Sequence, residues 1–103
     1  MHENSIKTYY EELKSLTNRQ AEIFNILQQR SNEVFTDREL KELLHYGDMN
    51  AVRPRITEMI KKGIIKEQGT TICNRTNKSV RIVRCIPHDE YERMQKNQTY
   101  LDL

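Results

Sequence analysis

Residues 51–65, AVRPRITEMIKKGII, contain one complete helix and the point at which it ends. Apolar residues recur at the i, i+4, i+7 and i+8 spacing that places them on one helical face; they are Val52, Ile56, Met59 and Ile60. Pro54 falls in the first turn, where its missing N–H costs little, and Gly63 is a natural helix terminator. The segment therefore predicts a helix over Ala51–Lys62 with one buried face.

Upstream of this helix, two capping boxes mark the starts of two others. Thr17 with Gln20 begins a helix that fades near Arg30, and Thr36 with Glu39 begins one that ends at Gly47. Between them, residues 34–35 form a short apolar connection. A further short helix is expected over Ser5–Ser15.

Downstream, the apolar pattern changes from a helical to an extended period. Residues 64–67 read as a short extended segment, and Gly69 permits a turn. Two β-rich runs then follow, Thr70–Arg75 and Val80–Ile86, separated by four turn-forming residues, which predicts a hairpin. Pro87 stops the second strand, and a final helix is expected over residues 88–98.

The predicted order is three helices, two of which are joined by a tight turn, and then a hairpin. This order is that of a helix-turn-helix with an appended wing. Residues 16–86 resemble the small winged helix-turn-helix proteins of bacteria and their phages. The segments that carry the resemblance are LTNRQ (16–20), TDREL (36–40), VRPRITEM (52–59), KGII (62–65) and the hairpin from CNRT (73–76) to Val83. The expected fold is α+β, mainly α, with a three-helix core, a two-stranded wing and additional terminal helices. We divide the chain into an N-terminal helical extension (1–15), the winged domain (16–86) and a C-terminal helical tail (87–103).

The small net charge of +2 hides an uneven distribution. Residues 1–50 hold six basic and nine acidic side chains, residues 51–86 nine and two, and residues 87–103 two and four, giving −3, +7 and −2. A basic segment between acidic ones is typical of a surface that meets a polyanion. The simpler alternative is a solvated basic face.

The resemblance places the third core helix in the major groove of DNA and the wing over the backbone or minor groove. Independently, the apolar stripe of that helix leaves Asn50, Pro54, Thr57 and Lys61 on the opposite face, with Arg53 at its edge; Arg55 falls nearer the buried side and ranks below Arg53. Arg53 suits guanine, Asn50 adenine, and Thr57 a thymine methyl or a phosphate. The candidate DNA-binding residues are Asn50, Arg53, Arg55, Thr57, Lys61, Lys62, Arg75, Lys78 and Arg81.

The sequence contains no arrangement of residues that is typical of enzymatic chemistry: no Ser or Cys arrangement suggests a nucleophile and base, and His-Glu-x-x-His is absent. Three glycines in all exclude a dinucleotide fingerprint or a phosphate-cradling loop. Cys73, Cys85 and His88 lack the close Cys-x-x-Cys spacing of a zinc site, so free thiols are the better interpretation. We expect no enzyme activity, no cofactor and no metal. The N-terminus lacks a signal-peptide pattern and no run is apolar enough to span a membrane, so a cytoplasmic location is expected.

Apolar side chains near both ends exceed what a small core needs; they are Tyr9, Tyr10, Leu13, Tyr91, Met94, Tyr100 and Leu101. They either pack back onto the domain or form a homodimer interface, and both alternatives stay open. The sequence thus predicts a winged protein that binds double-stranded DNA in transcriptional regulation. The alternatives are a phage or mobile-element accessory protein that uses the fold for protein–protein interaction, and one that acts in replication or recombination.

Overall fold

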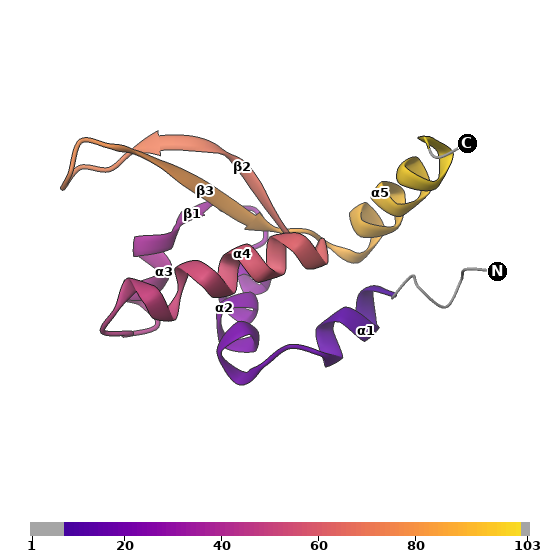
Figure 1. Ribbon diagram of the computed structural model, residues 1–103, viewed down its shortest axis with the longest axis horizontal. Helices are drawn as coiled ribbons and strands as arrows, with labels where there is room; N and C mark the ends of the chain where they lie inside the picture. Colours follow the sequence, from indigo (N-terminus) through magenta and orange to yellow (C-terminus); the bar gives the residue numbers. More distant parts are fainter. Residues whose placement is uncertain (1–7, 102–103) are drawn as a thin grey trace.

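A computed structural model describes residues 8–101 of the chain. The elements follow in the order α1 (Tyr9–Lys14), α2 (Asn18–Gln29), β1 (Phe35–Thr36), α3 (Asp37–Leu43), the 3₁₀ turn η2 (Met49–Ala51), α4 (Arg53–Lys62), β2 (Ile65–Ile72), β3 (Ser79–Cys85) and α5 (His88–Leu101). The molecule is elongated, with extents of 49 × 27 × 22 Å. The hairpin β2–β3 runs past α4 and beyond α3, while α1 and α5 lie at the opposite end (Figure 1). No helix in residues 8–101 is both long and apolar enough to cross a lipid bilayer.

Reciprocal capping boxes start three of the helices. The predicted boxes at Thr17 and Thr36 are confirmed, with Gln20 and Glu39 returning the hydrogen bond to the backbone. A third box, at Thr8, starts α1, so this helix begins later than predicted. The predicted helical residues 5–7 lie outside the described residues. Each box satisfies two of the unpaired N–H groups at a helix start, so these boundaries are fixed by local sequence.

The helix predicted over Ala51–Lys62 is divided at its start. Met49–Ala51 form a 3₁₀ turn, and α4 proper begins at Arg53, with Pro54 inside its first turn as predicted. At the other end Gly63 adopts a left-handed conformation, with φ of 83°, and ends the helix. The change of direction places Ile64 and Ile65 in the core.

The sheet has three strands in the order β1-β3-β2, all antiparallel, rather than the predicted two. The apolar connection before α3 is strand β1, in which Phe35 pairs with Val83 and Thr36 with Ile82. The predicted turn at Gly69 is wrong: β2 runs continuously from Ile65 to Ile72. Its register against β3 slips by one residue between Glu67 and Gly69, so the glycine belongs to a β-bulge.

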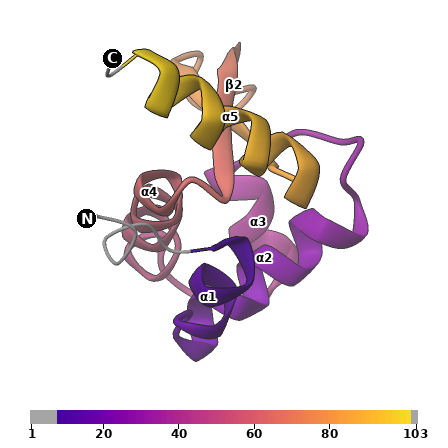
Figure 2. The same ribbon diagram turned by 90° about the vertical axis from the view of Figure 1, so that its right-hand side faces the viewer.

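One hydrophobic core joins the helices, the sheet and both terminal segments. Ile23, Leu27, Ile56 and Met59 are fully buried at its centre, and Tyr9 and Tyr91 belong to the same cluster. In Figure 2 both α1 and α5 face the viewer, with α5 above α1. The Tyr9 hydroxyl donates to the carbonyl of Ile86 (2.8 Å), and burial raises its pKa. The final helix, predicted over residues 88–98, extends to Leu101.

Candidate nucleic-acid interface

The exposed face of α4 is the one that the apolar stripe predicts. Val52, Ile56 and Met59 are fully buried, whereas Arg53, Pro54, Thr57 and Lys61 are exposed. The Arg53 side chain is 63% exposed. A helix face with donor groups near its N-terminal end is thus open to solvent.

A concave surface of about 850 Å³ lies between this end of α4, the start of α3 and the hairpin. Its cationic lining side chains come from three elements: Arg38 on α3, Arg53 on α4, and Arg75, Lys78 and Arg81 on the hairpin. Four of these five are among the residues predicted to bind DNA. Residues distant in sequence therefore contribute positive charge to one surface.

Carboxylates line the same surface, and Asp37 is the most buried of them. Its side chain is 8% exposed. Arg81 Nε donates to both carboxylate oxygens at 3.2 Å, and Arg81 Nη2 donates to one of them at 3.0 Å. Arg53 Nε approaches the same carboxylate at 3.8 Å. Asp37 therefore forms ion pairs with both Arg81 and Arg53.

Arg81 extends this contact to α4. Its Nη2 donates to the Thr57 hydroxyl (3.1 Å) and to the carbonyl of Arg53 (3.2 Å), and Thr57 Oγ1 in turn donates to that carbonyl (3.1 Å). Arg81 thus ties β3 to the first turns of both α3 and α4. The Thr57 hydroxyl therefore has no proton left to donate, while its methyl group takes part in none of these bonds.

The hairpin tip is exposed and carries two of the cations. Arg75 is 68% exposed and pairs with Glu42 on α3 at 3.3 Å, and the Lys78 side chain is exposed as well. A backbone bond from Cys73 N to Lys78 O closes the loop (2.9 Å), and Asn77 takes a left-handed conformation. Hydrogen bonds from the backbone of Thr76 and Arg75 lower the pKa of the Cys73 thiol to about 7.

Two predicted residues face α2 instead of the hairpin. Arg55 pairs with Glu58 (2.9 Å), which also accepts from Gln20 of α2 (2.8 Å). Asn50 lines a separate shallow depression beside Arg19 and Tyr46. These two positions therefore lie on the other side of the α4 N-terminus.

The two lysines near the end of α4 differ in their surroundings. Lys61 is exposed, but Lys62 donates to the Ser15 hydroxyl (3.0 Å) and pairs with Glu12 (3.5 Å). Lys62 therefore joins α4 to α1 and is separate from the concave surface.

Sequence reasoning missed two cations next to the predicted set. Arg38 lines the concave surface, and Arg19 stacks over the Tyr46 ring with its guanidinium 5.1 Å from the ring centre. Both lie in the first turn of a helix started by a capping box. That signal could have found them, because a capping box fixes where the first turn of its helix lies.

The two cysteines lie far apart along the hairpin. Cys73 follows the end of β2 at the tip, whereas Cys85 pairs with Ile65 at the base and is buried. Within the described residues, no three His, Cys, Asp or Glu side chains come together as a metal site would require.

The terminal helices bury part of their excess apolar surface. The rings of Tyr9 and Tyr91 meet edge to face, with centres 5.3 Å apart, while Tyr10 and Met94 remain exposed. The side chains of Tyr100 and Leu101 lie outside the described part of the structure.

These helices and the three-stranded antiparallel sheet define a small α+β fold. The chain is similar to a solved structure from Methanosarcina mazei Go1 described as a "possible transcriptional regulator", with a TM-score of 0.65. The likeness covers 88% of this chain and 74% of that one at 16% sequence identity, so it concerns the fold alone. No family model matches the sequence. No curated protein matches it either.

Proposed function

We propose that this chain is a winged helix-turn-helix protein that binds double-stranded DNA sequence-specifically and acts in transcriptional regulation. The observation that carries the proposal is that the exposed N-terminal face of α4 and the basic hairpin border one concave surface. The description of the Methanosarcina mazei structure, which shares the fold, agrees with a regulatory role. We assign no catalytic step to the protein.

In this proposal α4 enters the major groove and the hairpin lies over the backbone or minor groove. Arg53, exposed near the start of α4, reads guanine, and the Thr57 methyl contacts a thymine. Lys61, Arg75 and Lys78 contact phosphates. Asn50 reaches adenine on the α2 side, where Arg19 adds a further phosphate contact.

Three of the candidate residues take indirect roles. Arg81 fixes the angle between hairpin and α4 through its bonds to Asp37 and Thr57. Arg55 keeps α4 against α2 through Glu58, and Lys62 keeps α4 against α1. These side chains orient the surface because they already make hydrogen bonds or ion pairs within the protein.

The proposal is tested by selecting bound sequences from a random pool of duplexes with the full chain. A recovered consensus, with affinity that falls steeply as salt rises, supports it. No retardation of any duplex even at low salt contradicts DNA binding and favours the protein-interaction alternative. Binding without a consensus contradicts sequence-specific regulation and favours a replication or recombination role.

Variants separate base reading from phosphate contact. Arg53→Ala should cost about 1–3 kcal/mol of binding free energy and relax the preference at one base pair. Lys78→Ala should weaken binding to every duplex sequence and lower the slope of log affinity against log salt concentration by about one unit. A matched pair of variants is Arg75→Ala and Arg93→Ala, because both arginines are 68% exposed and each pairs with one exposed carboxylate. Only the first should weaken binding, because Arg93 lies on α5 outside the proposed surface.

A homodimer through α1 and α5 remains a prediction. Exposed Tyr10 and Met94 supply apolar area for it. A dimer predicts a pseudo-palindromic consensus with half-sites about 34 Å apart. A single, asymmetric site in the selected sequences would contradict it.

A further inference from the structure

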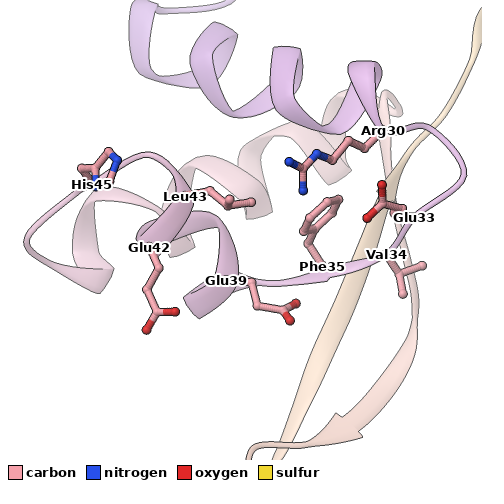
Figure 3. Close-up of a pocket in the computed structure, with 8 residues that line it drawn as sticks. All are labelled: Arg30, Glu33, Val34, Phe35, Glu39, Glu42, Leu43 and His45. Atoms are coloured by element: carbon pink, nitrogen blue, oxygen red, sulfur yellow. The ribbon is translucent and has the colours of Figure 1, made fainter.

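A second concave surface, of about 500 Å³, lies between the end of α2, strand β1 and α3. Figure 3 shows Phe35 and Leu43 facing the space between the two helices, with Arg30 above them. Val34 and Leu43 are 42% and 38% exposed, so this groove holds two of the five large apolar side chains that are exposed in the described part of the chain. Its floor is therefore partly apolar and open to solvent.

The charged rim of the groove is mostly acidic. Three carboxylates line it, from Glu33, Glu39 and Glu42, against the single guanidinium of Arg30. Glu42 also pairs with an arginine of the hairpin tip, and Glu39 accepts from the backbone in its capping box. Within the described part of the chain, the Glu33 side chain makes neither a hydrogen bond nor an ion pair, and it is exposed. This agrees with the net charge of −3 over residues 1–50 and contrasts with the basic hairpin.

The groove already holds one cation above an aromatic ring. The Arg30 guanidinium lies over Phe35, 5.9 Å from the ring centre. Cations are attracted to the face of an aromatic ring, and neighbouring carboxylates strengthen such a site. Because Arg30 already covers the Phe35 ring, the positive charge of a ligand would meet the rim carboxylates and its aliphatic group would meet Leu43.

We propose that this groove binds a short cationic segment of a partner protein, which lays an aliphatic side chain against the exposed side chain of Leu43, beside the largely buried ring of Phe35, and places its basic residues against Glu33 and Glu39. Charge complementarity selects this occupant, because an acidic rim repels nucleic acid and attracts a basic peptide. Most of the lining residues are separate from the proposed DNA surface; Glu39 and Glu42 line both. The inference does not depend on DNA binding.

The test is a titration of the ¹⁵N-labelled full chain, followed by backbone amide chemical shifts. The probe is the peptide acetyl-Arg-Leu-Leu-Lys-amide, compared with acetyl-Glu-Leu-Leu-Glu-amide and acetyl-Arg-Ser-Ser-Lys-amide. We expect saturable shifts at Val34, Phe35 and Leu43 with a Kd of about 0.1–1 mM, since a short flexible peptide loses much entropy on binding. The two comparison peptides should bind at least about tenfold more weakly.

Matched variants test the apolar and the charged parts separately. Leu43→Ser should weaken binding of the basic peptide several-fold, while Ile72→Ser, at a more exposed aliphatic residue on the hairpin (60% against 38%), should not. Glu33→Lys should weaken it about tenfold, and Glu67→Lys on β2 should leave it unchanged. The dispersion of the amide spectrum shows that each variant is folded.

Two results would overturn the proposal. Equal affinity for the acidic peptide, or shifts confined to other surfaces, would mean that the groove does not select a basic partner. Shifts at the groove residues that depend on protein concentration without peptide would mean that a second copy of the chain covers it.

Discussion

The contact between Asp37 and Arg81 should be the strongest polar tie between the hairpin and the helices. The perturbation is Asp37→Asn, which keeps the size of the side chain and removes its charge. Arg81, whose side chain is 21% exposed, would then lack a counter-ion beside a carbonyl and a hydroxyl. Losing one partner of a buried ion pair is costly because the remaining charge stays desolvated.

The size of the effect follows from this partial burial. A fully buried pair loses about 3–5 kcal/mol when one partner is removed. Here Arg81 keeps two hydrogen bonds and some contact with water, so we expect a loss of about 2 kcal/mol in the free energy of unfolding. Loss of a negative charge in the first turn of α3 contributes a further ~0.5 kcal/mol that does not involve Arg81.

A double-mutant cycle separates the two contributions. Urea unfolding of the wild type, Asp37→Asn, Arg81→Met and the double variant, followed by far-ultraviolet circular dichroism, should give a coupling energy of about 1.5–2.5 kcal/mol. Asp89→Asn is the control, since its pair with Arg93 is largely exposed and should contribute at most about 0.5 kcal/mol. A coupling energy near zero would refute the view that this contact holds the hairpin in place.

Other predictions concern single positions. Between about pH 6 and pH 8 the alkylation rate of Cys73 should rise about tenfold as its thiolate forms, whereas burial protects Cys85 and raises its pKa. Thiol-specific mass spectrometry measures both rates, and equal alkylation rates for the two cysteines would contradict the prediction. Gly63→Ala should lower the free energy of unfolding by about 1–2 kcal/mol, because φ at this residue is 83°. Gly47→Ala is the control: an added Cβ meets nothing within 4 Å, so the free energy measured by urea unfolding should change by less than about 0.5 kcal/mol. Glu42→Gln should tighten binding to non-specific duplex about two- to fivefold in fluorescence anisotropy, since it frees the hairpin-tip arginine and removes a carboxylate; unchanged affinity would show that this ion pair does not limit DNA contact.

The elements that could be predicted from sequence are those set by neighbouring residues. Capping at Thr17 and Thr36 needs only side chains three positions apart, and the end of α4 needs only Gly63. Strand β1 was missed because two residues carry no periodicity, and its existence depends on pairing with Val83 and Ile82, far along the chain. The bulge that replaced the predicted turn at Gly69 likewise depends on the register of its partner strand.

The same distinction holds for the candidate site: features set by neighbouring residues could be predicted, and features set by distant contacts could not. The exposed face of α4 could be predicted from the spacing of its apolar residues. Which cations on or near that face stay available could not, since Lys62 is taken by Ser15 and Arg81 by Asp37, each more than forty positions away. A count of basic residues measures the charge of a surface but does not show which of its donors are already bound.

The placement of the aromatic rings gives the molecule an uneven optical response. The chain has five tyrosines and no tryptophan, and Tyr9, Tyr10 and Tyr91 gather where α1 meets α5. The hairpin and α4 contain none. Intrinsic ultraviolet fluorescence should therefore report undocking of the terminal helices through Tyr9, Tyr10 and Tyr91. At the other end the reporter is Tyr46, which lies against Arg19 and beside Asn50, so a ligand that contacts only the hairpin should leave the emission almost unchanged.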